Sequence, residues 1–147
     1  MPDDKPSPLG LAIIVCDQII EDKLTHKKSL IGIFNQIAST NFPCRHPRVC
    51  IFVSLTEGRG GYTARLRLSH DATGTVVADM HGQIQFPDIN AVVEFSFDLV
   101  GLQFPQPGLY SIEFYCDEML VLERRFHVIQ MKQPQSPPPK GPPPAEL

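Results

Sequence analysis

Three acidic residues that lie close together in the sequence, Asp17, Glu21 and Asp22, form the densest group of side chains that could carry chemistry. Neighbouring carboxylates can act as general acid and base, or they can ligate calcium. Three further aspartates fall in expected loops: Asp71, Asp88 and Asp117. Alternate hairpin turns of a sandwich lie at opposite ends, however, so these loops need not bring the aspartates together. Aspartate favours turns on its own account, because its side chain accepts hydrogen bonds from nearby backbone amides. We therefore interpret the acidic group first as turn chemistry and keep a calcium site as the alternative.

Five histidines are spread over the chain, each near an expected strand end or on an outward position: His26, His46, His70, His81 and His127. No His-x-His or His-Glu-x-x-His spacing joins two of them, so a histidine metal site would have to assemble from distant segments. A Ser–His–Asp triad can assemble in the same way, but no Gly-x-Ser-x-Gly elbow marks a nucleophile. An enzyme would need a dispersed site, for which Asp17, Asp22 and a histidine are the candidates. We expect no catalytic residue, no metal and no cofactor.

The four cysteines are expected to be free thiols without a bound metal: Cys16, Cys44, Cys50 and Cys116. The segment from Cys44 to Cys50 lacks the close Cys-x-x-Cys pairs that are typical of a zinc site. Cys50 and Cys116 lie within expected strands and should pack as small core residues. Cys16 lies in an apolar strand, which would raise the pKa of its thiol and make it unreactive.

Residues 133–147 differ in composition from the rest of the chain, since nearly half of them are proline and none is aromatic. Such a segment cannot offset its ordering entropy by burial, so we expect a disordered tail with polyproline II character. The tail satisfies a P-x-x-P pattern, and such segments dock into aromatic grooves of partner domains. A partner-binding role would fall on Pro137, Pro138, Pro139, Lys140, Pro142, Pro143 and Pro144. A plain tether is the interpretation that we favour.

Charge and the N-terminus limit the partner and the compartment. The net charge of −3 argues against a nucleic-acid binder, which usually shows a basic stripe. The first residues are polar and acidic, and neither a basic region nor a small-residue cleavage site flanks the apolar run at 9–15. That run is far too short to span a bilayer, so we expect a cytoplasmic protein without a transmembrane segment.

Alternation of apolar and polar residues predicts β-strands, most clearly at residues 62–69 and 93–99. A helix would need apolar residues at three- and four-residue spacing, which these segments lack. We expect about eight strands, at residues 11–20, 29–38, 48–56, 62–69, 76–83 with a continuation to 86, 92–100, 109–116 and 119–129. Short strands with regularly spaced turns predict an all-β fold, an antiparallel two-sheet sandwich of the immunoglobulin-like type. This gives a flexible N-terminus at 1–9, a sandwich domain at 10–132 and the tail.

Three details complete the expected fold. Residues 11–20 are apolar nearly throughout, as in a strand that is covered on both faces or partly bulged. A single helical turn, if there is one, would fall at residues 88–91. The core should contain Leu66, Phe95, Phe97, Ile112 and Phe114.

Two parts of the chain carry a resemblance to a known family. The first contains the run Ala12-Ile13-Ile14-Val15-Cys16-Asp17, then Glu21-Asp22 and Lys28-Ser29-Leu30-Ile31-Gly32-Ile33-Phe34; the second contains Pro107-Gly108-Leu109-Tyr110 and the closing hairpin. Together, residues 11–128 are similar to a bacterial family of small proteins that form a domain of unknown function. The resemblance implies a β-sandwich and a bacterial origin, and it carries no activity and no site residues.

With no catalytic arrangement in view, the sequence favours a non-enzymatic binding or scaffolding module whose partner is another protein. This inference rests on analogy with other sandwiches, which use loops and sheet edges for recognition. The alternatives are a C2-like module that binds calcium or a membrane surface, and an enzyme with the dispersed Asp/His site.

Overall fold

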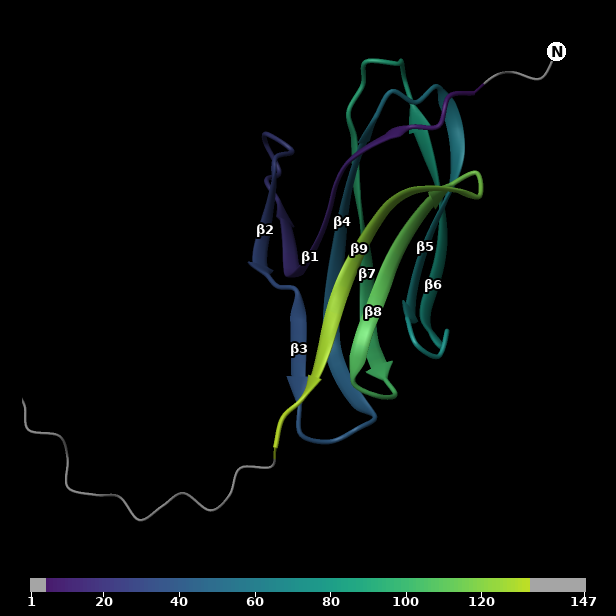
Figure 1. Ribbon diagram of the computed structural model, residues 1–147. Helices are drawn as coiled ribbons and strands as arrows, with labels where there is room; N and C mark the ends of the chain where they lie inside the picture. The colour runs from purple at the N-terminus through teal and green to yellow at the C-terminus, as the bar shows by residue number, and fades with distance from the viewer. Residues whose placement is uncertain (1–4, 133–147) are drawn as a thin grey trace, which may run out of the picture.

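The computed structural model describes residues 5–132, which form two packed sheets of strands joined by turns (Figure 1). The strands are β1 (Leu9–Glu21), β2 (Lys28–Ile33), β3 (Gln36–Ser39), β4 (Cys44–Thr56), β5 (Gly60–His70), β6 (Val76–Phe86), β7 (Val93–Phe104), β8 (Gly108–Cys116) and β9 (Met119–Gln130). One sheet has the order β2-β1-β4-β7 and the other β3-β9-β8-β5-β6. The predicted all-β two-sheet sandwich is confirmed. Among the described residues, no helix occurs that could cross a membrane.

The strand expected at residues 29–38 is wrong as a single element. It is two strands in different sheets, β2 beside β1 and β3 beside β9. Between them, Phe34 turns toward the interior, and its ring packs edge-on against Phe126 with the centroids 5.7 Å apart. The crossing lets β3 run parallel to β9, so the sandwich is antiparallel except for this pair. The exchange adds the ninth strand.

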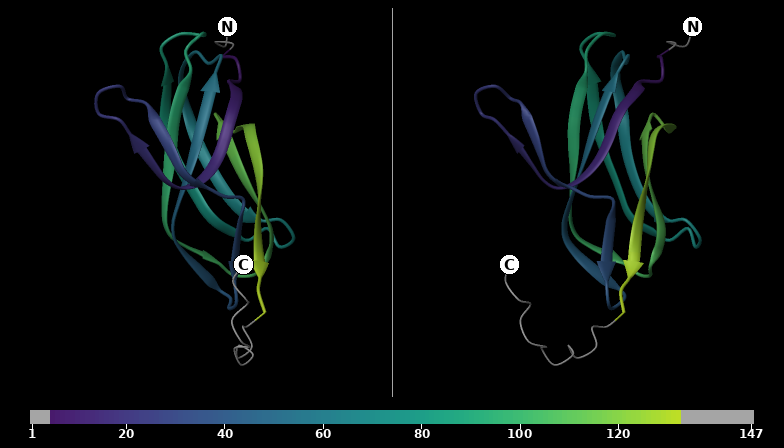
Figure 2. Two further views of the ribbon diagram at one scale, coloured as in Figure 1. Left: turned by 90° about the vertical axis from the view of Figure 1, so that its left-hand side faces the viewer. Right: turned by 60° about the vertical axis from the view of Figure 1, so that its left-hand side comes forward.

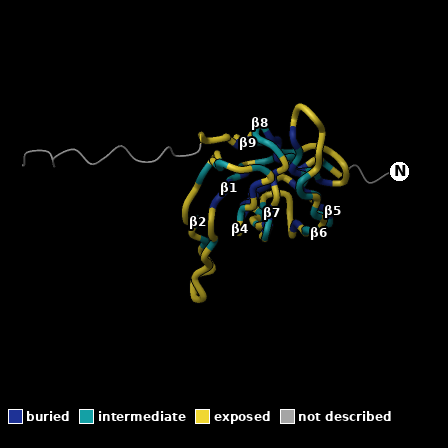
Figure 3. Tube along the Cα trace, turned by 90° about the horizontal axis from the view of Figure 1, so that it is seen from below, coloured by how far each residue is buried: buried dark blue, intermediate teal, exposed yellow. Residues whose placement is uncertain are grey.

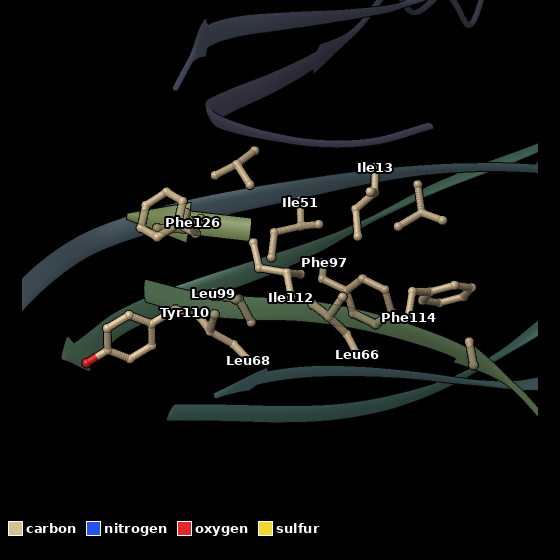
Figure 4. Close-up of a cluster of buried hydrophobic side chains, with 14 of the residues drawn as sticks. Ile13, Ile51, Leu66, Leu68, Phe97, Leu99, Tyr110, Ile112, Phe114 and Phe126 are labelled. Carbon is tan, nitrogen blue, oxygen red and sulfur yellow. The ribbon is translucent and has the colours of Figure 1, made fainter. Parts of the chain in front are cut away.

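The core lies between the sheets and contains the inward side chains of β1 and of β4 to β9, with Ile37 of β3 packed against it (Figure 4). Leu66, Phe97, Ile112 and Phe114 are buried as predicted. Phe95 was also predicted to be buried, but it is only partly so and packs on the core from its margin. Phe95 lies near the start of β7, toward one end of the strand, where its ring contacts Phe97 and Phe114 with centroids 5.8 and 5.4 Å apart.

A tyrosine and a histidine fix the loops at the start of β8. Tyr110 is fully buried, and its hydroxyl donates a hydrogen bond of 2.6 Å to the carbonyl of Gln106, four residues earlier. This arrangement is the tyrosine corner of immunoglobulin-like sandwiches. The ring of His70 packs edge-on against Tyr110 at 4.9 Å. Residues 88–91 form a turn closed by a 3.2 Å bond from the Ala91 amide to the Asp88 carbonyl.

Candidate protein-binding surface

The acidic residues singled out in the sequence are separated by the structure. Asp17 and Glu21 share one face of β1 but lie four residues apart, about 13 Å along a strand. The Asp22 carboxylate accepts hydrogen bonds from the amides of Leu24 and Thr25 at 2.9 and 2.8 Å, and these bonds hold the pKa of Asp22 below its usual value. Over the described residues, no three His, Cys, Asp or Glu side chains gather closely enough to hold a metal ion.

The loop aspartates also serve the backbone and neighbouring strands. Asp117 accepts a 2.8 Å bond from the amide of Thr63, and Asp88 accepts one of 2.8 Å from the amide of Asn90. The Asp71 carboxylate accepts a hydrogen bond of 2.5 Å from the hydroxyl of Ser111. Each carboxylate therefore has a structural partner, but of these three only Asp88 makes the short-range bond to a backbone amide that is typical of turn chemistry.

The histidines were expected near strand ends or on outward positions, and His70 is the last residue of β5, where its side chain is buried. Its Nδ1 accepts a bond from the Thr73 amide at 3.2 Å, so its Nε2 carries the proton and donates to the Pro107 carbonyl at 3.1 Å. A sequence signal existed, because His70 continues the inward positions of β5. Both ring nitrogens are thus engaged in holding loops together.

The pieces of a dispersed Asp/His site do not come together. The histidine beside the acidic group is His26, and its Nδ1 lies 3.5 Å from the carboxylate of Glu21, while Asp22 is bound to its own turn. The described residues also line a groove of about 490 Å³ between the ends of β6 and β7, where Val76, Leu102 and Pro105 meet. No ionisable side chain lines that groove.

All four cysteines are buried free thiols. Burial raises the pKa of the Cys116 thiol to about 12, and Cys116 belongs to the core as predicted. Burial also raises the pKa of the Cys16 thiol, with a further contribution from Cys50. Since a raised pKa lowers the thiolate fraction, these groups are poor nucleophiles.

The two sheets differ in the side chains that they present outward. The β3-β9-β8-β5-β6 sheet presents a charged face, on which Arg65 forms a two-bond pair with Asp79 at 2.9 and 2.7 Å. That pairing holds the pKa of Asp79 below its usual value. Other charged or polar residues on this face are His81, Glu113, Tyr115 and Arg125. Such a face is stable in water without a covering partner.

The β2-β1-β4-β7 sheet presents an apolar face. Register and alternation place on it Ala12, Ile14, Cys16 and Gln18 of β1, Ile31 and Ile33 of β2, Arg48, Cys50, Phe52 and Ser54 of β4, and Glu94, Ser96, Asp98 and Val100 of β7, so its centre is apolar and its polar residues lie mainly along β7. Cys16, Cys50 and Phe52 are buried, yet they do not belong to the core cluster between the sheets. They form a second apolar cluster on the outside. Val100 remains 74 % exposed at one edge of the face and Ile33 56 % exposed at the other.

Beyond Cys16, β1 and β2 leave the body of the sandwich as a two-stranded ribbon, residues 17–33 (Figure 2). The pairing of β1 with β4 ends at Cys16 opposite Cys50, whereas its pairing with β2 continues to Glu21. The ribbon is mainly exposed (Figure 3), and Leu24 at its tip is 92 % exposed. A two-stranded hairpin by itself is only marginally stable in water. The ribbon is therefore the part of the fold that gains most from a further contact.

The apolar run at 11–20 is a sequence signal for this surface. The apolar run at 11–20 predicted a strand covered on both faces or bulged, and β1 does carry a register shift between Gly10 and Ala12. Its inward side chains join the core, and its outward ones form the apolar face. The predicted binding residues of the tail, 137–144, lie outside the described residues.

Fold and surface together define a single immunoglobulin-like sandwich with one charged and one apolar outer face. The model of a family of unknown function, DUF6941, matches residues 11–129, so the chain belongs to that family. No curated protein matches the sequence.

Solved structures with a similar arrangement include β-glucosidases. One from Listeria innocua, in complex with isofagomine, aligns with a TM-score of 0.46 and 9 % identity over 67 % of this chain and 15 % of that one. One from Kluyveromyces marxianus gives a TM-score of 0.42 and 11 % identity over 63 % and 14 %. The chain thus spans only a small part of these enzymes, and the likeness carries no functional argument.

Proposed function

We propose that this protein is a non-enzymatic binding or scaffolding module that contacts another protein through its apolar face. The observation that carries the proposal is the contrast between the two outer faces of one sandwich. One face carries the Arg65–Asp79 ion pair and further charged side chains, and the other holds a cluster of buried apolar side chains outside the core. Exposed apolar side chains flank that cluster, with Ile33 56 % and Val100 74 % exposed, and exposed apolar patches on a soluble domain mark interaction sites.

The composition of the apolar face fits a protein partner better than a small ligand. Ile33 and Val100 supply exposed apolar area, and the Arg48–Asp98 pair at 2.8 Å gives the margin a polar rim. An apolar centre with a polar rim is the usual anatomy of a protein interface. The positions of Asp17, Glu21 and Asp22 give no support to the calcium or dispersed-enzyme alternatives.

We also propose a bacterial, cytoplasmic setting for this module. The bacterial origin follows from the sequence resemblance alone. Four buried free thiols support a reducing compartment, because exported domains usually pair their cysteines. Thiol counting on freshly purified, denatured protein tests this: four reactive thiols are expected, and a protected pair would contradict the assignment.

Photo-crosslinking in cells of the source organism tests the binding surface. A photoreactive residue at Val100 samples the apolar face, and one at Gln83, exposed on β6, samples the charged face as the matched control. We expect a crosslink to another protein from position 100 and none from position 83. The substitution Phe52→Asp, in a variant that still folds by circular dichroism, should abolish the crosslink. Equal crosslinking from both positions, or none from position 100, would contradict the proposal.

A further inference from the structure

The outer edge of β2 is unpaired. β2 ends the order of its sheet, so one side of Lys28–Ile33 has no neighbouring strand among the described residues. Ile31 and Ile33 on this strand are 44 % and 56 % exposed. Free strand edges are templates for pairing with another chain, and natural proteins usually block them. Here the edge is open over its full length.

The hydrogen-bonding groups of β2 that face outward can be assigned from the hairpin. The amide of Asp22 donates to the carbonyl of Lys27 at 2.9 Å. Because bonded residues alternate along an antiparallel pair, this bond directs the backbone groups of Ser29 and Ile31 toward β1 in the half of β2 next to the turn. At the other end the Phe34 amide donates to the Val15 carbonyl at 3.0 Å in the opposite phase, with the positive φ of Gly32 between the two halves. In the half next to the turn, Lys28 and Leu30 then direct their backbone groups outward. Leu30 lies at the middle of the free edge.

One carboxylate lies at this edge without a cation. A Cβ atom added at Gly32 would be 2.5 Å from Oδ2 of Asp17, so the Asp17 carboxylate lies over Gly32 on the face that Lys28 and Leu30 share. Among the described residues, neither Asp17 nor Lys28 takes part in an ion pair. The edge therefore carries an acid near one end and a base at the other.

We propose that β2 pairs with β2 of a second copy of this chain, antiparallel and centred on Leu30. In that register Leu30 faces Leu30 of the second copy, and Lys28 faces Gly32, about 5 Å away across the strands. Because Gly32 has no side chain, the Lys28 ammonium group reaches the Asp17 carboxylate that lies over it. The two-fold axis generates this ion pair twice. The edge is thus complementary to itself in charge and in shape.

The proposed pairing joins two four-stranded sheets into one continuous sheet. Its two-fold axis is perpendicular to the sheet, so both apolar faces lie on the same side. The inference goes beyond the proposed partner binding and is independent of it, because it uses the strand edge and not the face. A contact of one six-residue strand pair buries less than the roughly 1,200 Å² of a stable complex, so the dimer forms reversibly with concentration.

Analytical ultracentrifugation of the full chain and charge-reversal variants tests the pairing. We expect the wild type to shift from 16.4 kDa toward twice that mass as its concentration rises. Asp17→Lys alone and Lys28→Asp alone should each weaken association at least tenfold, because like charges then meet twice. An equimolar mixture of the two variants should associate again, since both contacts in the mixed dimer are Lys–Asp. The double variant should also associate.

Glu94→Lys is the matched control, because it reverses an exposed acid on β7, at the far edge of the same sheet. It should leave association unchanged, and all variants should keep the wild-type circular dichroism spectrum. A wild type that stays monomeric at millimolar concentration would overturn the proposal. Single variants that associate like the wild type, or a mixture that does not recover, would overturn it as well. None of these outcomes depends on the crosslink from Val100, which tests the partner site separately.

Discussion

Removing one oxygen atom from Tyr110 should destabilise the fold measurably. Tyr110 is fully buried, and its hydroxyl donates a 2.6 Å bond to the Gln106 carbonyl. Tyr110→Phe keeps the ring contacts with Phe104 and His70, whose centroids lie 5.2 and 4.9 Å away. The change therefore isolates the hydrogen bond of the tyrosine corner from the packing around it.

The magnitude follows from what Tyr110→Phe leaves behind. A typical hydrogen bond contributes about 1 kcal/mol net, and a carbonyl left without its donor in a buried place costs about 1–3 kcal/mol. We expect a loss of about 2 kcal/mol in the free energy of unfolding. For a domain of this size, that loss lowers the melting midpoint by about 4–8 °C. Urea unfolding should show a lower midpoint with an unchanged slope.

Tyr115→Phe is the matched control on the same strand. The Tyr115 hydroxyl donates to the carboxylate of Glu113 at 2.9 Å on the charged face, where water can replace the lost partner. Its cost should be within about 0.5 kcal/mol, as for most surface substitutions. If the two phenylalanine variants unfold at the same urea concentration, the corner is not the restraint that we infer.

Three further predictions concern the core, the charged face and the tail. Phe97→Ala should cost about 3–5 kcal/mol in urea unfolding because the side chain is buried in the core, and an unchanged midpoint would contradict its placement. Arg65 lowers the pKa of Asp79 from its usual 3.8, so this carboxylate stabilises the native state above about pH 4, and the stabilisation is lost as the pH falls through the lowered pKa. The stability difference between the wild type and Asp79→Asn should therefore shrink in acid and in high salt, and a difference constant with pH in urea titrations would refute it. Deleting residues 134–147 should leave the thermal midpoint unchanged, and a lower midpoint would mean that the tail packs on the sandwich.

The sequence correctly predicted the strands that have one face on the core and the other face in water. Residues 62–69 and 93–99 alternate strictly because one face meets the core and the other meets water, and both lie within strands. Residues 29–38 form two strands because the chain crosses between the sheets at Phe34 and Asn35; Asn35 favours turns, but one such residue without a proline does not by itself mark a break. The apolar residues on either side of Asn35 and Gln36 fit one long bulged strand as well as two short strands in different sheets.

The candidate surface could not be derived in the same way, because it depends on pairing between distant segments. Cys16 and Cys50 become neighbours only through the register of β1 with β4, and Phe52 becomes part of an outer cluster only beside Ile14. Alternation predicts that two faces exist, but it does not tell which of them meets the second sheet. For β1, both sets of side chains are apolar, so composition alone could not separate core from surface.

Asp17, Glu21 and Asp22 show why proximity along a strand is a poor guide to shared chemistry. An extended chain separates neighbours quickly, and successive side chains point to opposite faces, whereas pairing joins residues that are far apart in sequence. Asp22 therefore closes a turn, Glu21 meets His26, and Asp17 lies over Gly32, which is fifteen positions away. Each carboxylate has its own surroundings, so neutralising them one at a time should give three different phenotypes: a weakened hairpin turn for Asp22→Ala, little change for Glu21→Gln, and a lost edge charge for Asp17→Asn. Hydrogen exchange at the amides of Leu24 and Thr25 separates the first from the others, because only Asp22→Ala removes their acceptor. Equal exchange in all three variants would show that the acidic residues act as one group after all.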